Sequence, residues 1–260
     1  MAENAFYLPR GEGRFLPTAH TAGPWTPDAQ HFGPPSSLLV RALEELPRAW
    51  EGELARVTVE ILGPAPLTEL SVRARVERPG RSLELLSAEL ASGERTVARA
   101  SAWRVVGSDT SEAATTIEPD NWPPPEHCPL ADWPADWHGG YLDAMEWRTV
   151  AGSVVEPGPA AVWARQRVPL VEGEEPTPLQ RLFAVADSGN GVSNVLDAAG
   201  WWFINSELTV HLHRAPAGEW IGLDAVTTIG PRGVGAAEST LRDLGGPVAS
   251  GAQALMVRTR

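Results

Sequence analysis

Cysteine is almost absent from this 260-residue sequence, and two other signals are missing with it. The single cysteine, Cys128, excludes an internal disulfide and favours a reducing compartment. No run of about 18 apolar residues is present, which is the length that a membrane-spanning helix needs. The N-terminus also lacks the apolar core of a signal peptide. These absences predict a cytoplasmic protein that has no membrane partner.

Basic side chains are also scarce. The chain has 21 Lys and Arg against 33 Asp and Glu, which gives a formal net charge of −12. Such a surface repels nucleic-acid phosphates and anionic lipids, so nucleic acid is not an expected partner. An anionic small molecule is still compatible with it, because a local cluster of arginines can bind one.

What the sequence does contain is a β-strand pattern towards its C-terminus. In the range 205–214, Leu208, Val210 and Leu212 alternate with polar side chains, as in a half-buried strand. Three further strand-like runs follow after short turns rich in Gly and Pro, at 219–229, 234–244 and 248–257. Connections this short hold no crossover helix, so the four strands are predicted to form an antiparallel meander.

The same pattern occurs once more, earlier in the chain. Residues 57–106 can be laid over residues 208–257 at a constant offset of 151 without gaps. Strands are expected at 54–62, 67–77, 82–91 and 96–106. An apolar helix should precede each meander, one at 38–46 capped by Ser36 or Ser37 and one from Pro178 to Asp187. The sequence therefore predicts two copies of one design.

These patterns divide the chain into three parts. We assign residues 1–107 to the first half and 141–260 to the second, which opens with strands at 141–151 and 160–170. The part between them, residues 108–140, is rich in Pro and Trp and has no periodicity. We expect it to be a linker that lies on the surface with its Trp side chains packed down.

Four short motifs, in this order, make the chain resemble a known family. They are Pro17-Thr-Ala-His-Thr-Ala-Gly-Pro-Trp25, Gln30-His-Phe-Gly-Pro-Pro35, Leu208-Thr-Val-His-Leu-His-Arg214 and Ala252-Gln-Ala-Leu-Met-Val-Arg258. With the repeated helix and meander, they resemble the double hot-dog acyl-CoA thioesterases, related to acyl-CoA thioesterase II. The resemblance covers nearly the whole chain. It implies an α+β fold of two tandem hot-dogs, each an antiparallel sheet wrapped around a long apolar helix.

The resemblance also implies a catalytic set in the second half, made of an acid, a hydroxyl and a Gln. In the family the acid precedes an aromatic-His-Arg motif, and Glu207 holds that place here, where Asp is usual. The hydroxyl falls on Thr228 or its neighbour Thr227, and the alignment favours Thr228. The Gln lies five residues before a near-terminal Arg, which matches Gln253.

This set suits hydrolysis of a thioester. Glu207 would take the proton of a water held by Thr228 and Gln253, because a thioester carbonyl is electrophilic enough to need no Ser nucleophile. Backbone N–H groups near Gly33, at the start of the first helix, would stabilise the charge on the carbonyl oxygen. The remaining expected substrate contacts are Gln30, His31 and Thr227.

Each of these residues also has a purely structural interpretation. Glu207 could simply lie on the solvent face of its strand, where charged residues are usual. Thr228 is an ordinary strand residue, and Gln253 could make a structural hydrogen bond. Gly33 could permit a turn, and His31 could cap the helix. Asp187, at the end of the second helix, is interpreted as a cap and kept as a reserve acid.

No metal or other cofactor is expected. His211 and His213 share a strand face at a spacing that can bind zinc, but no third ligand is evident in the sequence. The leading hypothesis is an acyl-CoA thioesterase, and homo-oligomers through sheet edges or helices are compatible with it. The alternative is a non-catalytic protein that binds acyl thioesters or lipids, which the Glu at position 207 motivates.

Overall fold

The computed structural model describes residues 4–24, 26, 28–115, 121–134 and 137–260. Trp25, which ends the first family-like motif, and parts of the expected linker (116–120 and 135–136) lie outside the described residues.

The two predicted meanders are present. In the first half they are β3 Gly52–Ile61, β4 Leu70–Arg78, β5 Leu83–Ser92 and β6 Arg95–Val106. Their counterparts in the second half are β10 Glu207–Leu212, β11 Ile221–Ile229, β12 Val234–Asp243 and β13 Gly246–Thr259. Each half also carries a hairpin on its outer edge: β1 Tyr7–Pro9 with β2 Arg14–Pro17, and β7 Met145–Ala151 with β8 Ala160–Gln166. The repeat thus extends beyond the meanders.

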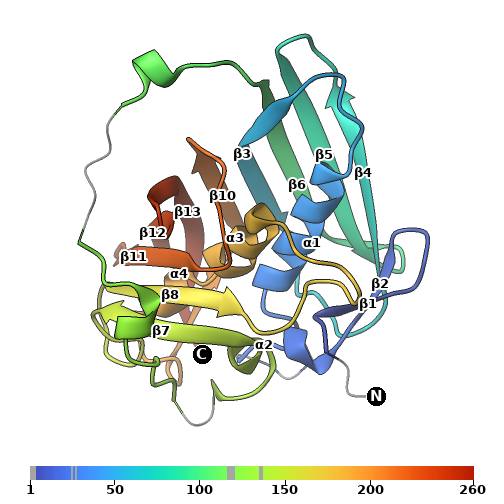
Figure 1. Cartoon of the computed structure of the whole chain (residues 1–260). Coiled ribbons are helices and arrows are strands. Elements are labelled where there is room, and N and C mark those ends of the chain that lie inside the picture. The colour runs from blue at the N-terminus through green and yellow to red at the C-terminus, as the bar shows by residue number, and fades with distance from the viewer. Residues whose placement is uncertain (1–3, 25, 27, 116–120, 135–136) are drawn as a thin grey trace.

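All described strands form one antiparallel sheet that runs through both halves (Figure 1). The junction is the pairing of β3 with β10, in which Thr58 lies opposite Thr209. These two residues are equivalents at the offset of 151, and their hydroxyl oxygens lie 3.1 Å apart. Each half therefore presents the same strand to the other, as expected for two copies related by an approximate two-fold axis.

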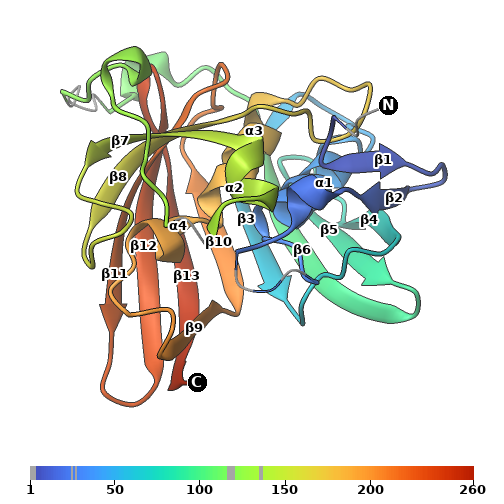
Figure 2. The same ribbon diagram turned by 90° about the horizontal axis from the view of Figure 1, so that it is seen from below.

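The helices lie between the two halves of the sheet (Figure 2). They are α1 Gly33–Glu44, α2 Gly140–Ala144, α3 Pro178–Ala186 and α4 Gly189–Val192. Short 3-10 turns lie before α1, at Ala19–Thr21, and between β6 and α2, at Ser111–Ala113 and Pro125–His127. Helix α1 packs on α3 and buries Leu38, Leu39 and Leu43. Gly33 is required at this crossing, because a Cβ atom there would collide with the Ala184 carbonyl oxygen. No helix in the described part of the chain is long and apolar enough to cross a membrane.

Two expectations about the helices are wrong. The first helix starts at Gly33, ahead of the expected Ser cap, because prolines fit the first turn, where backbone N–H groups have no helical partner. A long helix does not form in the second half, since α3 has 9 residues and the chain turns at Asp187 and Ser188 before the short α4.

Some element boundaries also differ from the predicted ones. Residues 141–151 begin as helix α2 and become strand only at Met145, and the strand predicted to reach residue 170 ends at Gln166. A short strand that the sequence pattern missed, β9 Trp201–Asn205, pairs with β13. In the linker, Trp133 is buried and stacks on Trp137, so the expected inward packing of tryptophan is confirmed for this side chain.

Candidate active site

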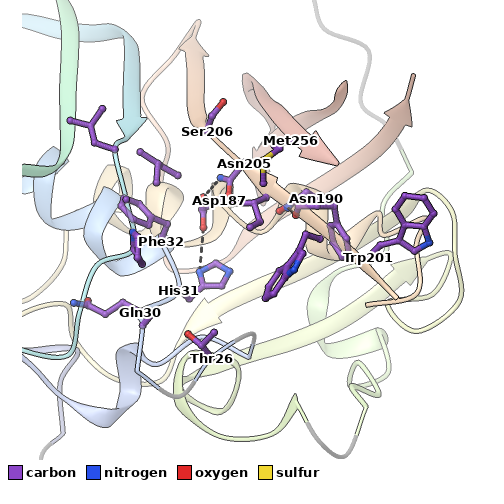
Figure 3. Close-up of a pocket in the computed structure, with 18 of the residues that line it drawn as sticks. Thr26, Gln30, His31, Phe32, Asp187, Asn190, Trp201, Asn205, Ser206 and Met256 are labelled. Atoms are coloured by element: carbon purple, nitrogen blue, oxygen red, sulfur yellow. Dashed lines mark hydrogen bonds and ion pairs between the residues drawn. The ribbon is translucent and has the colours of Figure 1, made fainter. Parts of the chain in front are cut away.

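A pocket of about 430 Å³ lies where β3 ends beside β9, next to the loop that leads into α1 (Figure 3). Polar groups gather on one wall, with Gln30 and His31 from the first half and Asp187, Asn190 and Asn205 from the second. The rest of the lining is mainly apolar: Ala29, Phe32, Ile61, Leu62, Gly63, Pro64, Trp201, Trp202, Phe203, Ile204 and Met256. An apolar pocket with a few convergent polar groups is the usual form of a ligand site.

Asp187 is the acid of this pocket. It ends α3 and is only 4% exposed. The Asn205 side-chain amide donates to Asp187 Oδ1 at 2.7 Å, and the backbone N–H of Phe32 donates to the same carboxyl group. Burial raises the pKa of Asp187 to about 7, although both hydrogen bonds act to lower it. A carboxyl group that titrates near neutral pH can accept a proton efficiently.

Gln253 holds the chain around Asp187 in place. It projects from β13, and its Nε2 donates to the Asp187 carbonyl oxygen at 3.0 Å and lies 3.5 Å from Asp187 Oδ1. Its Oε1 accepts the backbone N–H of Asn190 at 3.0 Å. One buried amide thus connects the end of α3 with α4 and fixes the corner that presents the carboxyl group.

His31 approaches Asp187 from the first half. Its Nδ1 lies 3.4 Å from Asp187 Oδ2 and accepts the Gly33 backbone N–H at 3.0 Å. The imidazole is stacked on the Tyr141 ring, with 3.8 Å between centroids and 7° between planes. Burial lowers the pKa of His31 to about 3, so the ring is neutral at physiological pH. The Gly33 N–H, predicted to bind the substrate carbonyl, is therefore engaged within the protein.

Gln30 lines the same pocket but is held by the first half. Its Oε1 accepts the Tyr7 hydroxyl at 2.7 Å, and its Nε2 donates to the Pro66 carbonyl oxygen at 2.7 Å. These bonds secure the loop before α1, so Gln30 shapes the pocket wall in this structure.

Glu207 does not meet Gln253. Thr209 lies opposite Ala252, and the Glu207 carboxylate accepts the Ala254 backbone N–H at 2.8 Å and the Thr209 hydroxyl at 2.8 Å. Gln253 points to the buried face of β13, whereas Ala252 and Ala254 are on its exposed face. The expected convergence of Glu207 with Gln253 is therefore wrong, because successive strand residues point to opposite faces of the sheet.

The choice of Thr228 over Thr227 is wrong for the same reason. Thr228 is on the exposed face, whereas Thr227 lies in one cross-strand row with Ala237 and Gln253. The hydroxyl of Thr227 is 2.7 Å from that of Ser193, which itself donates to the Gly189 carbonyl oxygen. Thr227 therefore contacts the end of α4 through Ser193 and does not line the pocket.

Sequence reasoning missed Asn205 altogether. In an unbroken strand Asn205 would share the outer face with Glu207, two positions on. The pairing instead sets Asn205 opposite Leu255 and Thr209 opposite Ala252, so one extra residue is accommodated at Ser206. Such a bulge reverses the alternation and turns Asn205 inwards.

The zinc hypothesis gains no support from the geometry. A ring nitrogen of His213 lies 3.0 Å from the Pro247 carbonyl oxygen. Within the residues that the structure describes, no group of three or more His, Cys, Asp or Glu side chains could hold a metal ion.

The fold defined by this sheet and these helices is that of known hot-dog proteins. A candidate thioesterase II from Thermobifida fusca superposes with a TM-score of 0.75 at 20% identity, covering 97% of this chain and 95% of its own. A hot-dog protein of unknown function from Alicyclobacillus acidocaldarius has a TM-score of 0.75 at 18% identity, covering 99% and 97%. Acyl-CoA thioesterase II of Mycobacterium marinum has a TM-score of 0.63 at 15% identity, covering 98% and 95%.

Comparison with family models identifies the family of the chain. The acyl-CoA thioesterase N-terminal domain matches residues 21–105, and the acyl-CoA thioesterase C-terminal domain matches residues 125–257. The chain belongs to the acyl-CoA thioesterase family and is a thioester hydrolase. No curated protein matches the sequence.

Proposed function

We propose that this protein hydrolyses an acyl-CoA thioester with a water activated by Asp187. The observation that carries the proposal is the buried Asp187 carboxyl group on the polar wall of an otherwise apolar pocket. Asn205 and Gln253 hold it there through amide hydrogen bonds. This set replaces the one that the sequence suggested, with Gln253 as the common member.

The arrangement supports a direct attack by water. Asp187 Oδ1 is occupied by the Asn205 amide, so Oδ2 is the atom that takes the proton. As the proton moves, the water oxygen bonds to the thioester carbonyl carbon, and the C–S bond then breaks. The thiolate leaves and takes up the proton that Asp187 accepted, which restores the carboxylate. A rigid acid at the pocket wall lowers the barrier by fixing the water in line with the carbonyl.

The apolar wall suits the acyl group. Phe32, Ile61, Trp202 and Phe203 line the pocket beside Asp187, and burying a hydrocarbon chain against them is favourable. Arg260 lines the same pocket with its guanidinium group 3.8 Å from the Trp202 ring centroid. We propose that it supplies the local positive charge for a phosphorylated carrier such as CoA.

The test is a thiol-release assay over short, medium, long and aromatic acyl-CoAs. We expect turnover of at least one of them, and a loss of at least about 100-fold in kcat for Asp187→Asn, the scale of general base catalysis. Glu207→Gln is the matched control and should retain near-normal kcat. Full activity in Asp187→Asn, or loss only in Glu207→Gln, would contradict the assignment of the base.

The alternative function, binding of acyl thioesters without turnover, loses its motivation. It was prompted by Glu at position 207, and that carboxylate contacts the backbone and Thr209 on the exposed face of the sheet. Saturable binding of acyl-CoA with no thiol release at any chain length would favour this alternative. A cytoplasmic location, a role in fatty acid metabolism and association into homo-oligomers are further proposals, drawn from the sequence and the family.

A further inference from the structure

The proposed hydrolysis needs a hydrogen-bond donor for the carbonyl oxygen of the substrate. When water adds to a thioester, negative charge develops on that oxygen, and a fixed donor lowers the barrier by stabilising it. Three backbone N–H groups of the polar wall are already engaged within the protein: Phe32 donates to Asp187, Gly33 to His31 Nδ1 and Asn190 to Gln253 Oε1. A side chain on this wall is the next source of a donor.

His31 has such a donor. Its Nδ1 accepts the Gly33 N–H at 3.0 Å, so the single proton of the neutral imidazole is on Nε2. Burial lowers the pKa of His31 to about 3, which keeps the ring neutral at physiological pH. Among the described residues, the ring contacts the Gly33 N–H, the Asp187 carboxyl group and the face of Tyr141, and none of these contacts uses the Nε2 proton. The Nε2–H group is thus available to a ligand in the pocket that His31 lines.

This donor lies close to the proposed base. Asp187 Oδ2 is 3.4 Å from Nδ1, and one ring carbon separates Nδ1 from Nε2, so Nε2 is near the water that Oδ2 would activate. Figure 3 shows the imidazole of His31 beside Asp187 on the wall of the pocket. A thioester carbonyl bound there can present its carbon to the water and its oxygen to Nε2, each at about 3 Å.

The surrounding residues hold the imidazole in this orientation. It is stacked on the Tyr141 ring with 3.8 Å between centroids, and the Tyr141 hydroxyl donates to the Ala184 carbonyl oxygen at 2.6 Å. Gly33 is packed against the same carbonyl, and its N–H fixes the ring tautomer. A donor that is fixed before the reaction needs no reorganisation when charge develops on the substrate.

We propose that His31 is a catalytic residue whose Nε2–H group donates a hydrogen bond to the thioester carbonyl oxygen and stabilises the oxyanion that forms when water adds. The proton stays on Nε2 throughout, and the charge on the oxygen returns to the carbonyl bond when the C–S bond breaks. A neutral imidazole can polarise a carbonyl in this way, because it donates a hydrogen bond without first taking up a proton. The inference rests on the proposed function, in which the substrate carbonyl lies beside Asp187.

The test compares His31→Phe with His31→Gln. Phenylalanine keeps an aromatic ring on Tyr141 but has no donor, whereas the glutamine amide can place an N–H near the position of Nε2. For an acyl-CoA that the wild type hydrolyses, we expect kcat to fall at least about 100-fold in His31→Phe, the usual loss for one oxyanion donor, and to fall less in His31→Gln. KM should change much less, because the charge develops only in the transition state. His211→Phe, at an exposed position of β10, is the matched control and should keep its kcat.

A competing donor predicts the opposite result. In His31→Phe the Gly33 N–H loses its acceptor and becomes free to bind the carbonyl oxygen itself. If Gly33 is the donor that matters, His31→Phe keeps or gains kcat, and that outcome would overturn the inference.

A measurement without turnover separates this inference from the proposed function. The probe is an acyl-CoA analogue with a methylene group in place of the thioester sulfur, which keeps the carbonyl and cannot be hydrolysed. Its isotope-labelled carbonyl stretch should lie at lower frequency on the wild type than on His31→Phe, and the Nε2 signal in the nitrogen NMR spectrum of the wild type should shift on binding. If Asp187→Asn keeps full activity while both signals respond, only the proposed base is wrong. If Asp187→Asn is inactive and neither signal responds, only the role of His31 fails.

Discussion

At the scale of single residues, Asp187 combines two opposing requirements. A base must be desolvated to be strong, yet a buried carboxylate destabilises the fold. Asn205 and the Phe32 N–H compensate the charge in part, and the pKa of about 7 is the balance between burial and these two donors. The site therefore costs stability at the pH at which it works.

Asp187→Asn should reveal this cost. The pKa of Asp187 is raised from its ordinary value of 3.8 to about 7, so its stabilising contribution is complete below pH 4 and is lost as the pH rises through 7. Above that range the free energy of unfolding of the wild type should have fallen by about 4 kcal/mol, and that of the variant should not show this fall. Denaturant unfolding of both proteins at pH 5 and pH 8.5 should capture about 3 kcal/mol of this loss, because the rest occurs below pH 5, with the exposed Asp224→Asn as control. Equal differences at both pH values would contradict the buried titration.

Residue-level prediction from sequence assigned Gln253 to a buried position correctly and failed for its partners, while the catalytic role of Gln253 stays a prediction. The short motif around Gln253 lies in a regular strand, in which alternation correctly assigns the buried face. The bulge at Ser206 cannot be seen in the alternation, so the sequence pattern does not show that Asn205 and Glu207 face opposite sides of the sheet. Asp187 was kept only as a reserve acid. The Ser, Gly and Asn residues that follow it are typical of any helix end, so they do not distinguish a capping Asp from a catalytic one.

At the scale of secondary-structure elements, the break between α3 and α4 positions the acid. Asp187 and Ser188 turn the chain, and Gly189 starts α4 directly against Gln253. A Cβ atom at Gly189 would lie 2.8 Å from Gln253 Oε1, closer than nonbonded atoms tolerate. Glycine is therefore needed so that the amide can reach the Asn190 N–H.

Gly189→Ala should affect catalysis more than stability. The obstructed atom is the end of a flexible side chain, which can move aside while the fold persists. We expect kcat to fall by at least about tenfold, because a displaced Gln253 no longer fixes the Asp187 corner, and Tm to change by only a few degrees. Gly191→Ala is the control, since a Cβ there meets nothing within 4 Å. Equal effects of the two substitutions would show that the contact with Gln253 is unimportant.

Elements were easier to predict than their ends. The Gly- and Pro-rich turns between alternating runs located the strands of both meanders within a few residues. The start of α1 was predicted after a cap at Ser36 or Ser37, whereas Pro34 and Pro35 already occupy the first turn of the helix. Strand β9 escaped because two tryptophans obscure its alternation.

At the scale of the whole molecule, the repeat produces one site from two similar halves. At the offset of 151 that relates residues 208–257 to 57–106, Gln253 corresponds to Ala102, which cannot replace it. The first half instead contributes His31, Gln30 and the start of α1 to the pocket of the second. The site is thus complete only when both halves are folded together.

This shared construction predicts a single unfolding transition. The sheet continues from β3 into β10, and α1 packs on α3, so the main core is shared by both halves, and only a small separate cluster around Phe203 and Leu255 belongs to the second half alone. Leu39→Ala, in the buried face of α1, should cost about 2 to 5 kcal/mol by leaving a cavity. The loss of thiol-release activity and the tryptophan fluorescence transition should shift together to lower temperature, although the acid lies in the second half. Leu83→Ala, at a position 44% exposed, is the control and should shift neither. Two separate transitions, of which Leu39→Ala moves only one, would mean that the halves fold independently and that the pocket between them forms by docking.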